Sequence, residues 1–337
     1  MSTKIAIYIF AFLLSFSAFA QQESETSFLI SFGSCNKVEE PNPFWSQIYD
    51  LQPDLFIWGG DNIYADTDDM AKMKAIYERQ NKITAYAKVK QSIPMMATWD
   101  DHDYGKNDAG REFSKKEESQ QLFLDFMGVP EDDKRRKREG VYHMQDFFKN
   151  GKKIKVIALD TRYFRSPLED SQRTDKRYEP LSDSSGTMLG KKQWQWFENI
   201  LDNSDADYNI IMSSIQLLSA EHGFETWANL PGERSRFLKL IEESDARAVI
   251  VLSGDRHISE FSRKALANKE YPLIDFTSSG LTHAYTRFDG EPNKHRVGEV
   301  VAARSFGLVH INLENNEVSF SIIGAEGDEL EKLEQAY

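Results

Sequence analysis

Short apolar runs alternate along the chain with longer stretches in which apolar residues recur at helical spacing. An apolar run bounded by polar residues is typical of a strand buried on both faces, whereas the longer period predicts an amphipathic helix. Strands are expected at residues 28–32, 55–58, 93–97, 154–159, 208–215 and 248–252. Helices are expected at residues 44–51, 70–89, 119–127, 191–201 and 234–242. The alternation predicts an α/β domain.

Two more apolar runs near the end of the chain, residues 306–313 and 317–323, flank Asn315 and Asn316. Asn favours tight turns, so these runs are expected to form a hairpin that closes a mixed sheet. No internal repeat or Pro/Gly/Ser-rich linker divides the chain beyond its N-terminal segment. We therefore expect one domain over residues 21–337.

Residues 1–20 differ from the rest of the chain. Lys4 is their only charge, an apolar stretch follows it, and Ala18 and Ala20 form a small-residue cleavage site before Gln21. This pattern predicts a general secretory signal peptide and a periplasmic or secreted protein. The alternative is an uncleaved membrane anchor, but the apolar stretch is shorter than the ~20 residues of a spanning helix. We expect no transmembrane anchor after cleavage.

Composition narrows the possible partners. The chain of 337 residues carries 41 basic and 54 acidic side chains, for a net charge of −13. This balance argues against nonspecific binding of nucleic acid, so no nucleic-acid partner is expected. Hydrophobic residues at 40% and aromatic residues at 12% favour a packed globule over disorder.

Polar and charged residues follow the expected strands directly. The run after residues 93–97 brings Asp100, Asp101, His102 and Asp103 together. Adjacent carboxylates repel one another, so an ordered site would raise their pKa values or place a cation between them. Similar chemistry follows four other strands, and in α/β sheets the ligand site lies beyond the carboxyl ends of strands. The strand ends are therefore expected to meet at one metal site.

Four residues within these turns have alternative interpretations. Cys35 is the only cysteine and is either a metal thiolate, which we favour, or a small buried hydrophobe. Asp61 can bridge two cations and Tyr64 can give a phenolate to a ferric ion, but they can also be a helix cap and a core residue. Arg162 can bind phosphate through its bidentate guanidinium, or pair with Asp160 or a neighbouring acid.

The ordered set of motifs resembles the PhoD-like (alkaline phosphatase D) metallophosphoesterases. The motifs are Gly-Ser-Cys at 33–35, Gly-Asp-x-x-Tyr-Ala-Asp at 60–66, Trp-Asp-Asp-His at 99–102, Leu-Asp-Thr-Arg at 159–162, Leu-Gly-x-x-Gln-Trp-x-Trp at 189–196, Trp-x-x-x-Pro-x-Glu-Arg at 227–234 and Ser-Gly-Asp-x-His at 253–257. The resemblance implies a metallophosphatase-type four-layer sandwich, with two facing mixed β-sheets flanked by helices. It covers nearly all of the chain after the signal peptide.

The resemblance also implies a site. A ferric ion would be held by Cys35, Asp61, Tyr64 and Asp255. A second ion, calcium in this family, would be held by Asp61, Asp101 and His257. His102 would contact the phosphate and help the leaving oxygen depart, and Arg162 is the second catalytic candidate. Outer ligands are left open among Asp103, Asn107 and Asp108.

The other histidines carry weaker signals. His222 follows a strand but is interpreted as a second-shell or surface residue, because members of the family tend to have Gln in the register of Gln216. No metal role is expected for His143, His283, His295 and His310, which have no acidic or Cys neighbours at metal-binding spacing.

These observations predict an exported, monomeric, metal-dependent phosphoesterase that hydrolyses phosphate esters by attack of metal-bound hydroxide. Its substrates would be small-molecule or lipid-derived phosphate esters. One alternative is a phospholipase-type phosphodiesterase acting on lipid headgroups, although no membrane-binding amphipathic helix is evident. Another is a catalytically silent phosphate-binding protein.

Overall fold

The computed structural model describes residues 26–182 and 185–337, so the expected signal peptide lies outside the described residues. Within them, the strands form two large sheets and one small one. The order in the six-stranded sheet is β15 (Glu329–Ala336), β14 (Glu317–Gly324), β13 (Ser305–Asn312), β1 (Ser27–Gly33), β2 (Leu55–Gly59) and β3 (Met95–Thr98). The order in the seven-stranded sheet is β12 (Arg296–Val301), β10 (Ser259–Lys264), β11 (Leu273–Ser278), β9 (Val249–Ser253), β8 (Tyr208–Met212), β5 (Lys152–Ala158) and β4 (His143–Lys149). Strands β6 (Glu169–Asp170) and β7 (Tyr178–Glu179) pair with each other.

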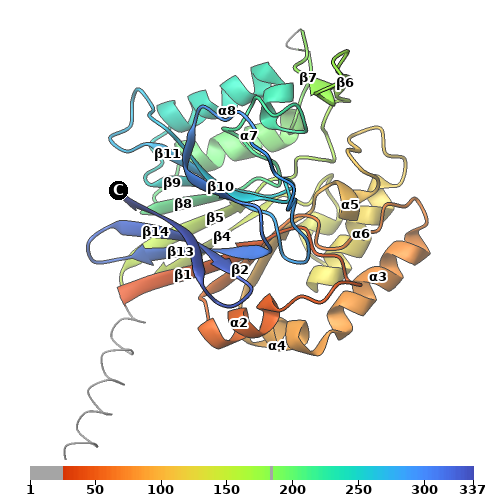
Figure 1. The fold of residues 1–337 in the computed structure, drawn as a ribbon, viewed down its shortest axis with the longest axis horizontal. Coiled ribbons are helices and arrows are strands. Elements are labelled where there is room, and N and C mark those ends of the chain that lie inside the picture. The colour runs from red at the N-terminus through yellow and green to blue at the C-terminus, as the bar shows by residue number, and fades with distance from the viewer. Residues whose placement is uncertain (1–25, 183–184) are drawn as a thin grey trace, which may run out of the picture.

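Helices cover the outer faces of both sheets (Figure 1). The α-helices are α2 (Phe44–Leu51), α3 (Met70–Lys82), α4 (Thr84–Ser92), α5 (Asp101–Tyr104), α6 (Lys116–Met127), α7 (Gly190–Asp202) and α8 (Pro231–Glu243). Two short 3₁₀ helices are η1 (Lys134–Arg136) and η2 (Trp227–Asn229). None of the helices within the described residues combines the length and apolar character needed to cross a bilayer.

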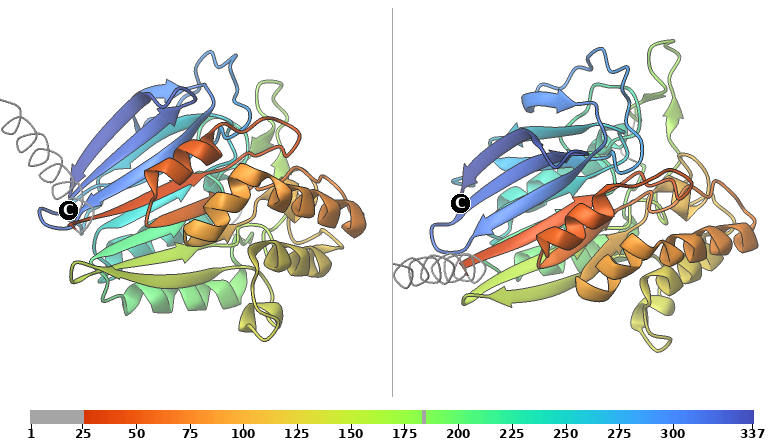
Figure 2. Two further views of the ribbon diagram at one scale, coloured as in Figure 1. Left: turned by 90° about the horizontal axis from the view of Figure 1, so that it is seen from below. Right: turned by 60° about the horizontal axis from the view of Figure 1, so that its bottom comes forward.

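The two sheets face each other across a shared apolar core (Figure 2). Side chains alternate along each strand, so Leu55 and Ile57 of β2 enter this core while Phe56 and Trp58 pack on the helical side. A second layer of packing joins β2 to α2, α3, α4 and α6, and a third joins β8 and β9 to α7 and α8. The expected four-layer sandwich of two mixed sheets flanked by helices is therefore confirmed.

Two sequence predictions about elements have different outcomes. The hairpin near the end of the chain is confirmed, because β13 and β14 pair antiparallel. The single helix expected at residues 70–89 is wrong, because Ile83 is extended (φ −66°, ψ 115°) and separates α3 from α4. The apolar period continues across the break, but α3 packs against α6 whereas α4 packs against α2. Because α3 and α4 pack against different helices, the chain has to change direction between them.

The parallel strands place their carboxyl ends at one edge of the molecule. In one sheet β1, β2 and β3 run parallel, and in the other β5, β8, β9 and β11 do. The turns that follow these strands carry most of the chemistry-bearing motifs. Their side chains form the candidate site.

Candidate metal centre

The candidate site is built on turns with unusual backbone geometry. Four residues after strands β1, β2 and β9 have positive φ: Cys35 (63°), Asp61 (50°), Asp255 (68°) and His257 (54°). Non-glycine residues in the left-handed region persist only where the surrounding structure enforces them. Gly60 precedes Asp61 at φ 96°, and a Cβ there would lie 2.6 Å from Cβ of Asp100. Glycine therefore allows two motif-bearing turns to approach closely.

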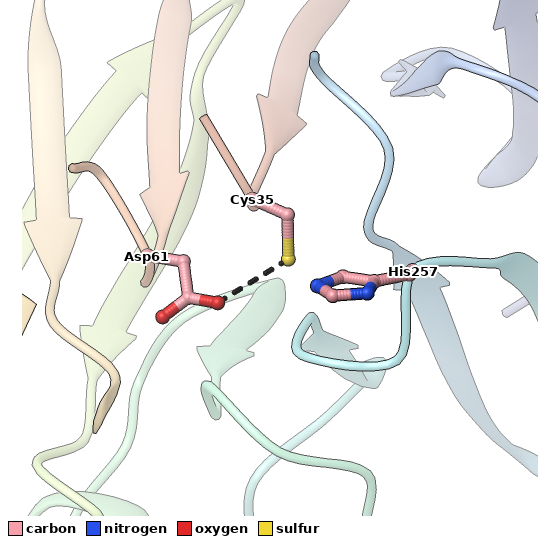
Figure 3. A group of neighbouring side chains, drawn as sticks. All are labelled: Cys35, Asp61 and His257. Atoms are coloured by element: carbon pink, nitrogen blue, oxygen red, sulfur yellow. Dashed lines mark hydrogen bonds between the residues drawn. The ribbon is translucent and has the colours of Figure 1, made fainter. Parts of the chain in front are cut away.

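The first donor group contains Cys35, Asp61 and His257, each of which offers a ligand atom within 4.8 Å of the others. Figure 3 shows the Cys35 sulfur between the Asp61 carboxylate and the His257 ring, with Sγ 3.4 Å from Oδ2 of Asp61. Tyr64 completes the group, because its Oη lies 3.1 Å from Oδ2 of Asp61 and 3.0 Å from Nε2 of His257. Thiol, carboxylate, phenol and imidazole thus face one point.

Two further donor groups adjoin the first. Asp100, Asp101 and Asp255 form one, and Asp61, Asp101 and His102 form the other. Asp61 belongs to the group with the thiol and to a group with Asp101. It therefore occupies the position expected of a bridging carboxylate.

The donor groups differ from the ligand sets implied by the family resemblance, which remain a prediction. His257, rather than Asp255, lies with Cys35 and Asp61, whereas Asp255 lies with Asp101. Both residues are in a turn with positive φ, so two side chains that are close in sequence project toward different donor groups. Sequence spacing alone does not reveal this grouping of side chains.

Burial disfavours the charged forms of several donors. It raises the pKa of the Cys35 thiol to about 11 and the pKa values of Asp61 and Asp255 well above their usual range. Oδ2 of Asp100 is buried without a hydrogen-bond partner. A bound cation would reverse this cost, because it favours the deprotonated form of each donor. The donor set therefore fits metal ions.

His102 lies beside the donors, on a stack of aromatic rings. Its Nδ1 lies 2.8 Å from the carboxylate of Asp66, and its ring stacks on Tyr64 with centroids 4.1 Å apart. Burial alone would lower the pKa of His102, but the charges of Asp61, Asp101 and Asp66 raise it to about 11. The protein without metal thus favours a protonated imidazole whose Nε2 remains available.

Arg162 is fully buried and forms ion pairs with neighbouring acids, which is the second of the two alternatives expected for it. Its guanidinium pairs with Asp100 and Glu225 at 2.5 Å, rather than with Asp160. Arg165 pairs with Glu225 as well, with Nε 2.9 Å from Oε1. Sequence reasoning missed Glu225, because no motif marks an acid that partners two distant arginines.

Asp103 accepts hydrogen bonds from the backbones of two turns at the site. Its carboxylate accepts hydrogen bonds from the backbone N–H groups of Asp61, Asn62 and Asp100, at 2.7–3.3 Å. It is completely buried, and burial raises its pKa to about 8. Asp103 therefore joins the two turns that carry the donors.

The other open candidates lie farther out. Asp108 accepts a hydrogen bond from Oη of Tyr178 at 2.7 Å and pairs with Arg177, while the exposed Asn107 donates to it. Asp108 also forms a donor group with Asp101 and Glu225.

Two histidines outside the motifs have defined positions in the structure. His222, expected either behind the ligands or on the surface, is buried, and its Nδ1 accepts a hydrogen bond from the N–H of Phe224. His283, for which no metal role was expected, lies at the site with Nε2 3.2 Å from Nε2 of His257. The turn after β11 brings His283 there, and it has no motif to signal this. Ser279, in the same turn, lies 3.0 Å from Sγ of Cys35.

A cavity of about 180 Å³ opens onto the donors. Asp101, His102, Asp255 and His257 line it. Arg177 and Arg256 also line it and supply positive charge, whereas Asp108 and Glu225 add negative charge. Because the acids outnumber the arginines, bound metal ions would be needed for the cavity to receive a small anion.

Comparisons with known proteins find similar sequences. The family model described as PhoD-like phosphatase matches residues 30–318. Alkaline phosphatase D of Bacillus subtilis (strain 168) is 26% identical over 239 residues, which are 63% of this chain and 40% of that protein. The chain thus spans less than half of this curated relative's length.

Solved structures resemble the fold. A structure of PhoD superposes with a TM-score of 0.72 at 18% identity, over 92% of this chain and 68% of that one. A purple acid phosphatase from yellow lupin (Lupinus luteus) seeds has a TM-score of 0.60 at 13% identity, over 93% and 54%. A dimetal phosphatase from Danio rerio has a TM-score of 0.52 at 13% identity, over 92% and 99%. Because the family model matches most of the chain, this protein belongs to the PhoD-like phosphatase family.

Proposed function

We propose that this protein is an exported, metal-dependent phosphoesterase. The observation that carries the proposal is the meeting of thiol, carboxylate, phenol and imidazole donors from separate strand ends beside a small cavity that Arg177 and Arg256 also line. Membership of the PhoD-like phosphatase family and the similarity to a dimetal phosphatase support it.

The chain offers positions for two ions. Cys35, Asp61, Tyr64 and His257 would hold one, and Asp61, Asp101 and Asp255 would hold the other. Bound metal ions would supply Lewis acidity toward the phosphate oxygens and activate a water molecule as nucleophile. Asp61 belongs to the donor groups of both positions.

The residues around the donors have separate tasks. His102, oriented by Asp66, would give a proton to the departing oxygen of the ester. Arg177 and Arg256 would neutralise phosphate charge from the cavity wall. Arg162 would act indirectly, because it is buried against Asp100 and holds that carboxylate in place.

Metal identity is part of the proposal. Thiolate and phenolate are electron-rich donors that suit ferric iron, and oxygen ligands suit calcium at the other position. Iron bound in this way would give visible absorption. Tyr64→Phe and Cys35→Ser should each change that band. A colourless, fully metallated and active protein would exclude iron.

The decisive experiment combines metal analysis of the purified protein with a panel of phosphate monoesters and diesters, including lipid-derived ones. Hydrolysis should disappear on chelation and return when metal is added back. Full activity in metal-stripped protein would overturn the proposal.

Export is tested separately, because the mature protein should begin at Gln21 if the signal peptide is cleaved as expected.

A further inference from the structure

Phe224 is an exposed aromatic ring at the edge of the candidate site. It lines the same cavity as Asp101, His102 and His257, yet 41% of it is exposed to solvent. Few large apolar side chains among the described residues are so exposed. Part of the ring contacts Arg256 and His222, and the rest is exposed at the cavity, within reach of a ligand bound there.

The backbone around Phe224 is fixed on both sides. The preceding carbonyl, of Gly223, accepts hydrogen bonds from the N–H groups of Arg177 and Tyr178, each at 2.9 Å. The following residue, Glu225, is buried and pairs with two arginines. The N–H of Phe224 itself donates to Nδ1 of His222 at 3.1 Å. The ring is therefore presented on a rigid support.

The ring also has a cation against it. The guanidinium carbon of Arg256 lies 4.5 Å from the ring centroid, and Arg256 is anchored in turn by Glu291 at 2.8 Å. Cation–π contact and stacking on the His222 ring, with centroids 6.1 Å apart, orient the ring further. Orientation before binding reduces the entropy cost that a ligand would meet.

We propose that Phe224 forms an aromatic subsite that binds the planar organic group of a phosphate ester while the phosphate lies against the metal-binding donors. The subsite rests on the proposed function and adds a substrate class to it: esters of aromatic or other flat alcohols are preferred over esters of small aliphatic alcohols. The energy comes from stacking of the planar group on the exposed part of the ring.

Two phosphonates that cannot be hydrolysed, phenylphosphonate and methylphosphonate, test the subsite. Calorimetry on the metal-loaded protein measures each dissociation constant without any influence of leaving-group reactivity. The wild type should bind phenylphosphonate roughly 3- to 10-fold more tightly than methylphosphonate. Phe224→Ala should abolish this ratio and leave methylphosphonate binding unchanged, whereas Phe224→Tyr should keep the ratio.

Phe148 provides a matched control, because it is 73% exposed on β4 and does not line the cavity. Phe148→Ala should leave the ratio unchanged. If Phe224→Ala unfolds, Phe224→Leu replaces it and should lower the ratio. The subsite is overturned if the wild-type ratio is near one, or if the ratio is unchanged in Phe224→Ala or Phe224→Leu. It is also overturned if either variant loses affinity equally for both phosphonates. Absence of ester hydrolysis and of binding by either phosphonate overturns the proposed function and the subsite with it.

Discussion

At the residue scale, His102 is held in a position where only one of its ring nitrogens can act. Nδ1 contacts Asp66, and the ring is stacked on Tyr64, so Nε2 is the atom available to a leaving group. His102 also lies next to the proposed ligands, with Nε2 4.0 Å from Oδ1 of Asp101, so its role has to be separated from metal binding by experiment.

His102→Asn should lower kcat by about 100- to 10,000-fold, as expected for loss of a general acid, while bound metal is retained. Esters with activated leaving groups such as nitrophenol should lose less, because they need little protonation. Steady-state kinetics on matched esters and metal analysis measure both effects. Equal losses for activated and unactivated esters would mean that His102 only positions phosphate.

Arg162 differs from His102 because its guanidinium is enclosed by acids. Arg162→Met should lower the free energy of unfolding by about 3–5 kcal/mol, since Asp100 and Glu225 would remain buried without their partner. Chemical denaturation measures this change. Arg162→Lys keeps the charge and should retain part of the stability. Loss of rate in Arg162→Lys with unchanged stability would instead support direct contact with phosphate.

At the scale of elements, the helix after the Asp61 turn depends on its cap. The carboxylate of Asp69 accepts hydrogen bonds from the N–H groups of Ala71 and Lys72 at the start of α3. Asp69→Ala should therefore cost about 1 kcal/mol of stability, measured by chemical denaturation. Asp68→Ala is the control, because it removes only an exposed ion pair with Lys106. An equal loss in both variants would contradict the cap.

Strand β4 contains a histidine that links stability to pH. Burial, together with the charge of Arg135, lowers the pKa of His143 to about 4. In the unfolded chain this pKa returns to about 6.5, so the unfolded state binds the proton first as pH falls. The contribution of a neutral His143 is thus complete above pH 6.5 and is lost between about pH 6.5 and 4.

His143→Gln should remove this pH dependence. The difference in melting temperature between wild type and variant should shift in favour of the variant as pH is lowered from 7.5 to 4.5. Thermal unfolding at several pH values measures it. A constant difference across this range would show that His143 does not titrate on unfolding.

At the scale of the whole molecule, the candidate centre joins turns from both sheets, so metal binding should stabilise the entire domain. A site saturated at about 100 times its dissociation constant adds about 2.7 kcal/mol. Chelation should therefore lower the melting temperature, and added metal should restore it. Asp61→Asn, which removes the shared ligand, should show a smaller shift. An unchanged melting temperature in stripped wild-type protein would contradict binding at this position.

The sequence by itself determined the architecture and most of the donors. Apolar runs such as residues 55–58 must be buried on both faces, which requires a sheet covered by helices, and motifs directly after such runs must lie at the carboxyl edge. The structure confirms the sandwich and brings the donors together. Their metal-binding roles and the cleavage before Gln21 remain predictions.

Only the tertiary structure decided what depends on packing between segments distant in sequence. The break at Ile83 follows from two helices serving different neighbours, which periodicity does not record. The donor groups that Asp255 and His257 join depend on a turn with positive φ angles, and the position of His283 depends on a turn after another strand. Local pattern fixes which residues are buried and which strand ends carry acids, but the direction of each side chain depends on backbone angles that neighbouring turns impose.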